Sequence, residues 1–231
     1  MLKRINDEWN LLYGIMKDKN HTHIPQNQTH LKTGELEIAE LINANRSGCL
    51  QNVTFIVPES LSFPTPKFDS FNMWNAFSNE NCDGAILYRA SGEKFDLAFV
   101  ELKSGYDSDN IWKAGKQIKV SVQKMFLLLG CIPSWEELEI NKIYGIIAAL
   151  RPCSQQLVNI KALSSLPKED WGNKSLWINL AYKGNCYSSF EDIDNIKIPN
   201  LPKEIEIRFL PCDKCTGLRC NLPYNGAGCM Y

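Results

Sequence analysis

Three residues in the middle of the sequence could together perform metal-assisted chemistry. Asp83 opens the strand-like run CDGAILYR, and Glu101 and Lys103 close the next run, KFDLAFVELK. Carboxylate oxygens suit Mg²⁺, and a bound divalent ion lowers the pKa of water and stabilises developing negative charge. A lysine beside such an ion can orient or deprotonate the attacking water. These side chains would therefore suit the hydrolysis of a phosphodiester bond.

The two runs that carry these residues predict a β-hairpin. Residues 82–89 and 94–103 favour strands, and the turn-forming ASGE lies between them. If the turn is centred in ASGE, the numbers of directly paired residues sum to about 183, which places Asp83 within one position of Glu101. Lys103 shares a face with Glu101, because alternate side chains of a strand project from the same side. We therefore expect both carboxylates and the ammonium at one end of the hairpin.

An alternative interpretation treats the same residues as surface charges on a solvated hairpin end. That alternative predicts mixed polar residues around them. Instead, Glu101 and Lys103 follow the apolar run LAFV, which predicts a buried strand. Charged residues at the end of a buried strand are more typical of a functional site.

The stretch NCDGAILY followed by FVELKSG resembles the core of the PD-(D/E)xK nuclease superfamily of restriction-endonuclease-like and RecB-like enzymes. In that family an acidic residue begins one strand, and the (D/E)xK triplet ends its hairpin partner. Asp83, Glu101 and Lys103 match these positions, whereas Cys82 replaces the family's proline. The resemblance covers roughly residues 34–150. It implies an α/β fold with a central mixed β-sheet flanked by helices, and a deoxyribonuclease that depends on Mg²⁺ or Mn²⁺.

Residues 110–129 predict a strongly amphipathic helix, with lysines and glutamines crowded on one side. The resemblance implies a Gln or Lys on this helix that faces the active site, and we choose Gln117. Lys113 and Lys124 lie on nearly the same face, so we expect them to contact the phosphates of a nucleic acid. The alternative for the lysines is an ordinary solvated face.

A helix over residues 33–46 is predicted from GELEIAEL, with Thr33 as its N-cap. Many members of the family carry a glutamate on the first core helix that completes the metal site. The resemblance therefore suggests Glu37, which we prefer to Glu35 and Glu40. An ordinary surface glutamate is the alternative.

Periodicity and turn residues predict the other elements. They are a helix over 1–18, a strand over 52–57, a long loop over 58–81, a strand over 142–150, a helix over 154–164, and strands over 176–182 and 204–210.

Four of the nine cysteines crowd into the end of the chain, as Cys212-x2-Cys215-x4-Cys220-x8-Cys229. A Cys-x2-Cys pair can present two thiolates to a tetrahedral ion, which predicts a structural Zn²⁺ site. RecB-like nucleases with an iron–sulfur cluster resemble this pattern, with x5 where this chain has x4 and an upstream cysteine that Cys49 could match. A tail without metal is the third alternative. We therefore divide the chain into a nuclease-like domain, 1–210, and a Cys-rich tail, 211–231.

The composition is that of an ordinary globular protein, with 44% hydrophobic and 22% charged residues. The net charge of −1 means that any nucleic-acid surface is a local patch. Asp7 and Glu8 interrupt the region where a signal peptide would need an apolar core, and no apolar run reaches the roughly 20 residues of a membrane span. We expect a cytoplasmic protein with no membrane partner.

The function expected from these observations is phosphodiester hydrolysis, with DNA ahead of RNA as the substrate. Restriction, phage defence or DNA processing would suit such an enzyme, by analogy of fold and site. The alternative is a catalytically inactive nuclease-fold subunit. It would bind nucleic acid or protein partners within a larger defence or repair complex.

Overall fold

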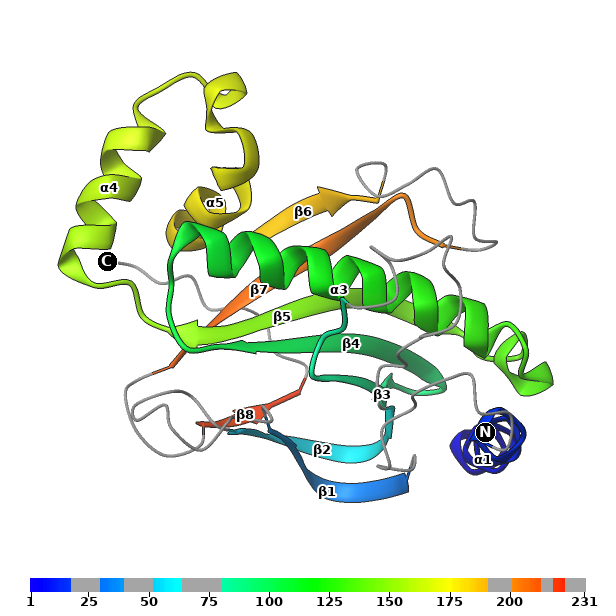
Figure 1. The fold of residues 1–231 in the computed structure, drawn as a ribbon. Helices are drawn as coiled ribbons and strands as arrows, with labels where there is room; N and C mark the ends of the chain where they lie inside the picture. Colours follow the sequence, from blue (N-terminus) through cyan, green and yellow to red (C-terminus); the bar gives the residue numbers. More distant parts are fainter. Residues whose placement is uncertain (18–29, 40–51, 64–79, 191–200, 213–217, 223–231) are drawn as a thin grey trace.

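The chain forms an α/β structure around one mixed β-sheet (Figure 1). The computed structural model describes residues 1–17, 30–39, 52–63, 80–190, 201–212 and 218–222. In chain order the helices and strands are α1 (Leu2–Lys17), β1 (His30–Ala39), β2 (Asn52–Phe63), β3 (Gly84–Ser91), β4 (Lys94–Lys103), α3 (Ser108–Leu129), β5 (Ile140–Leu150), α4 (Ser154–Ser164), α5 (Ser175–Lys183), β6 (Asn185–Ser189), β7 (Glu204–Cys212) and β8 (Leu218–Asn221). Short 3-10 helices span Pro133–Trp135 and Lys168–Lys174.

The strand order is β1-β2-β3-β4-β5-β7-β6, and β8 pairs with β2. Neighbours from β1 to β4 are antiparallel, as are β6 and β7, whereas β4–β5 and β5–β7 are parallel. Parallel neighbours need a crossover, and α3 provides it between β4 and β5. Figure 1 shows α3 along one face of this part of the sheet, with β1, β2 and β8 on the other side.

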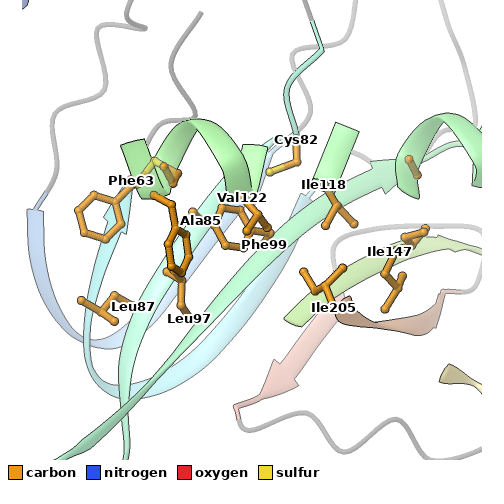
Figure 2. Close-up of a cluster of buried hydrophobic side chains, with 14 of the residues drawn as sticks. Phe63, Cys82, Ala85, Leu87, Leu97, Phe99, Ile118, Val122, Ile147 and Ile205 are labelled. Atoms are coloured by element: carbon orange, nitrogen blue, oxygen red, sulfur yellow. The ribbon is translucent and has the colours of Figure 1, made fainter. Parts of the chain in front are cut away.

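Two hydrophobic clusters lie on opposite faces of the central strands. Along β4, Leu97 and Phe99 belong to the cluster beneath α3, whereas Ala98 and Val100 belong to the second cluster. This follows from the alternation of side chains along a strand. Figure 2 draws part of the first cluster, in which Ile118 of α3 is labelled together with Phe99. The second cluster includes residues of β1, β2 and β8. The central strands are therefore buried on both faces.

The predicted helix over 33–46 is wrong for its described part, because residues 30–39 form β1. Leu36 and Ile38 are buried while Glu35 and Glu37 are exposed, which is the two-residue alternation of a half-buried strand. Pairing with β2, a contact with a distant part of the chain, stabilises this conformation. Residues 40–46 lie outside the described part.

The predicted strand over 176–182 is also wrong, because Ser175–Lys183 form the helix α5. A short apolar run fits a buried strand or a buried helix equally well by periodicity. Gly184 closes the helix with φ of 71°, and its amide donates to Leu180 O at 3.0 Å. This glycine was the signal for a helix end.

The other predicted helices and strands are confirmed with small shifts of their ends, and β6 and β8 were missed. β2 runs on to Phe63, so the first part of the expected loop over 58–81 is strand, and residues 64–79 lie outside the described part. Within the expected tail, 211–231, residues 211 and 212 belong to β7 and residues 218–221 form β8, so these parts of the tail are strands of the sheet. Within the described residues, no helix has both the length and the apolar character that a bilayer crossing requires.

Candidate active site

The hairpin of β3 and β4 brings Asp83 to the end of β4. Gly84, rather than Asp83, pairs with Val100, so the register lies one residue from the expected one. The Asp83 amide nevertheless donates to Val100 O at 3.0 Å. Its carboxylate Oδ2 accepts a hydrogen bond from the amide of Leu102 at 2.7 Å. The Asp83 carboxylate therefore lies against the peptide that joins Glu101 to Leu102.

Glu101 and Lys103 form an ion pair on the α3 side of the sheet. Lys103 Nζ lies 2.5 Å from Glu101 Oε1, and the side chains are 12% and 3% exposed respectively. The ammonium also donates to Gln117 Oε1 at 2.8 Å. Charge-assisted hydrogen bonds of this kind are short and strong where water is largely excluded. The ammonium is therefore fixed between the strand and the helix.

Gln117 links this ion pair to the segment that precedes Asp83. Its amide Nε2 donates to Asn81 O at 2.7 Å, while its Oε1 accepts from Lys103. The two ends of the amide thus have opposite partners, which fix its orientation. The structure brings Asp83, Glu101, Lys103 and Gln117 together, as expected from the sequence.

The connection between β4 and α3 is anchored by residues that sequence reasoning missed. Tyr106 Oη donates to Trp177 O at 2.8 Å, and Trp177 Nε1 donates to Tyr106 O at 3.1 Å. Asp107 caps α3 by accepting from the Asn110 amide at 2.8 Å. The cap could have been found, since Asp is one of the residues preferred at an N-cap and precedes the helical periodicity here. The reciprocal pair with α5 joins distant parts of the chain and has no local sequence signal.

Cys82, the residue before Asp83, is a buried thiol next to this group. Burial raises the pKa of the Cys82 thiol, and the negative charges of Glu101 and Asp83 raise it further, against a lowering contribution from Ser121. The thiol therefore remains protonated and adds no charge.

The donor set fits a hard divalent cation. No group of three or more His, Cys, Asp or Glu placed to hold a metal occurs among the described residues. Mg²⁺ does not need such a group, because it is commonly held by one or two carboxylates together with water and substrate phosphate. Asp83 and Glu101 supply two carboxylates at the end of one hairpin. They therefore suit Mg²⁺ or Mn²⁺ at this position.

Glu37 does not join this group in the way expected. It lies on β1 opposite Thr54, not on a helix, and its side chain is exposed. Leu36 and Ile38 point into the second cluster, so Glu37 projects away from it. Glu101 and Lys103 likewise lie on the face of β4 that points away from the second cluster, beneath α3. The structure therefore corrects the helix expected around Glu37 to a strand, and its supporting role at the site stays a prediction.

The two lysines chosen as phosphate contacts differ in their surroundings. Lys113 is exposed, which suits the expected role. Lys124 is fully buried and donates to Glu80 O at 2.9 Å and to Asn81 Oδ1 at 2.8 Å. A buried ammonium cannot meet a phosphate of the nucleic-acid backbone, so this expectation for Lys124 is wrong. The helical wheel showed on which side of α3 Lys124 lies, but it could not show that residues 80 and 81 cover that side.

Cys212 and Cys220 are buried in the second hydrophobic cluster. Burial raises the pKa of the Cys220 thiol to about 11. Cys49, Cys215 and Cys229 lie outside the described residues. A Zn²⁺ site or an iron–sulfur cluster at the cysteines therefore stays a prediction.

No protein-family model, no curated protein and no solved structure matches this chain. The residues of the site therefore carry the functional argument.

Proposed function

We propose that this protein is a metal-dependent nuclease of the PD-(D/E)xK type, with a restriction-endonuclease-like fold. The supporting observation is the hydrogen-bonded group at the end of β4, in which Lys103 joins Glu101 to Gln117. Asp83 lies against the peptide between Glu101 and Leu102. The substrate is a phosphodiester, with DNA ahead of RNA, and the biological setting is restriction, phage defence or DNA processing.

In the proposed mechanism, Asp83 and Glu101 would hold Mg²⁺ or Mn²⁺ at the end of the hairpin. When bound, that ion would supply Lewis acidity, which lowers the pKa of water and offsets phosphate charge. An ammonium has three N–H donors, and among the described residues Glu101 and Gln117 take two of those of Lys103. The third N–H orients the attacking water or binds a phosphate oxygen. Gln117 fixes the direction of that donor.

The decisive experiment compares DNA cleavage by matched variants of two ion pairs, one at each end of β4. E101Q and K103M remove the charges of the candidate site. K94M and E139Q remove those of an exposed pair at the other end of the strand, where Lys94 Nζ lies 2.7 Å from Glu139 Oε1. Single-stranded and supercoiled DNA are incubated with Mg²⁺ or Mn²⁺. We expect cleavage by the wild type, K94M and E139Q, and a loss of at least about 100-fold in E101Q and K103M.

Equal cleavage by all five proteins would assign the activity to a contaminant or to another site, and the proposal would then be wrong. Cleavage by none of them would favour a second candidate function, the inactive nuclease-fold subunit. One observation supports that candidate, namely that the Lys103 ammonium lies 2.5 Å from the Glu101 carboxylate and offsets its charge. Calorimetric titration with Mn²⁺ separates the two, because an inactive module needs no cation at Glu101.

A further inference from the structure

Three polar side chains form a stripe along α3 that faces residues 80–82. Gln117, Ser121 and Lys124 follow at intervals of four and three residues, so they share one side of the helix. Gln117 donates to Asn81 O, Ser121 Oγ accepts from the Cys82 amide at 2.8 Å, and Lys124 donates to Glu80 O and Asn81 Oδ1. Each of the three residues immediately before Asp83 is therefore held by α3.

Two members of this stripe are costly to bury. Ser121 and Lys124 are both 0% exposed. An ammonium that leaves water loses several kcal/mol of hydration, which only excellent partners offset. An apolar side chain of similar volume often stabilises such a position as well or better. The stability of the fold therefore gives no reason for a lysine at this position. The hydrogen bonds by which Lys124 holds residues 80 and 81 do give one.

That segment sets the position of the Asp83 carboxylate. Asp83 follows Cys82 directly, and its Oδ2 accepts from the Leu102 amide at 2.7 Å. Asp83 lies directly before the first residue of β3, and its amide donates to Val100 O of β4. The backbone on its N-terminal side is held by the stripe.

We propose that Lys124 is a positioning residue, which with Ser121 holds residues 80–82 on α3 and thereby places the Asp83 carboxylate beside Glu101. Lys124 itself touches neither the phosphate nor the metal. This inference deepens the proposed function, and a test by Mn²⁺-dependent cleavage rests on that function. A test by amide hydrogen exchange does not depend on it.

The test compares two buried lysines of the same helix. K124M keeps the length and apolar stem of the side chain but removes the hydrogen bonds to Glu80 O and Asn81 Oδ1. K119M makes the same change at Lys119, which is 8% exposed and donates to Ser189 O at 3.1 Å, away from Asp83. Hydrogen exchange of single amides is followed by NMR in the full chain without metal. The Leu102 amide reports directly on the Asp83 carboxylate, because it donates to Oδ2.

We expect exchange of the Leu102 and Cys82 amides to be at least about tenfold faster in K124M, with K119M like the wild type at both positions. Similar exchange at Leu102 in K124M and the wild type would overturn the proposal. A uniform acceleration over all amides of β3 and β4 would also overturn it, because that indicates general destabilisation. If K124M does not fold, S121A tests the same attachment of residues 80–82 to α3. We then expect the Leu102 and Cys82 amides to exchange about threefold faster than in the wild type.

The second readout is the Mn²⁺ concentration that gives half-maximal cleavage. We expect K124M to need about tenfold more Mn²⁺ and to recover its rate when that ion is supplied, because a displaced carboxylate binds the ion more weakly. K119M should keep the wild-type midpoint. An unchanged midpoint in K124M would contradict the inference. If the wild type does not cleave DNA, the proposed function fails, and the exchange of the Leu102 amide still decides the role of Lys124.

Discussion

Replacement of Lys103 by Met should destabilise the protein far more than replacement of an exposed lysine of the same strand. K103M leaves the Glu101 carboxylate, whose side chain is 3% exposed, without the ammonium that lies 2.5 Å away. Removing one partner of a buried ion pair costs about 3–5 kcal/mol. Lys103 is itself 12% exposed, and water can enter the space that it leaves. We therefore expect a loss of about 2–4 kcal/mol in the free energy of unfolding.

The double variant E101Q/K103M gives the matching test. It removes both charges and leaves no uncompensated carboxylate, so its free energy of unfolding should lie within about 1.5 kcal/mol of the wild-type value. K94M breaks the exposed pair with Glu139, where the side chains are 51% and 63% exposed. Such a surface pair contributes only about 0–1 kcal/mol.

Urea unfolding, followed by tryptophan fluorescence at fixed pH, measures these differences if the dependence on urea stays constant among the variants. Similar midpoints for K103M and K94M would refute the reasoning, because they would mean that the Glu101 carboxylate does not depend on Lys103. Addition of Mn²⁺ extends the test. A cation bound at Glu101 replaces the lost positive charge, so Mn²⁺ should stabilise K103M more than the wild type.

Three further results are expected. G145A should lower the free energy of unfolding, measured by thermal unfolding, by about 1–3 kcal/mol. A Cβ at Gly145 would lie 2.7 Å from Cγ2 of Ile118, a stiff, branched side chain. A midpoint equal to that of the wild type would contradict the tight packing of α3 on β5. A hydrogen bond from Arg208 lowers the pKa of Glu206, so this carboxylate contributes stability above its ordinary pKa, and that contribution is lost as the pH falls through the lowered value. Unfolding measured below pH 4.5 should therefore depend less on pH in E206Q than in the wild type, and equal slopes would exclude this carboxylate as a cause. K113A should weaken DNA binding, measured in Ca²⁺ by anisotropy, and lower the slope of affinity against salt by about 1, whereas an unchanged slope would remove Lys113 from the phosphate contacts.

The hairpin could be predicted from the sequence because its determinants are local. The turn between the two apolar runs fixed the pairing of Asp83 with the end of β4 to within one residue. The helix that follows Lys103 was equally readable, because its apolar positions repeat over its whole length. Those two elements together place Gln117 above Lys103.

The errors concern contacts between distant parts of the chain. Glu37 was assigned to a helix because GELEIAEL contains both a helical and an alternating pattern, and pairing of β1 with β2 favours the alternating one. Lys124 was assigned to the surface because a helical wheel cannot show that residues 80 and 81 cover it. A glutamine, a serine and a lysine on one face of a helix nevertheless form a local pattern. It could have suggested that this face binds a segment of backbone.

The position of β8 has a consequence for the order in which the molecule folds. Leu218 pairs with Val53, so this contact closes a very long loop, whereas β3, β4, α3 and β5 follow one another directly in the chain. Contacts between residues close in sequence form early, because they cost less chain entropy. During synthesis from the N-terminus, the hairpin and α3 can assemble long before Leu218–Asn221 emerge. The apolar side chains of β2 that later meet β8 stay uncovered on that side in the meantime, so a growing chain exposes an aggregation-prone surface on the face away from the candidate site.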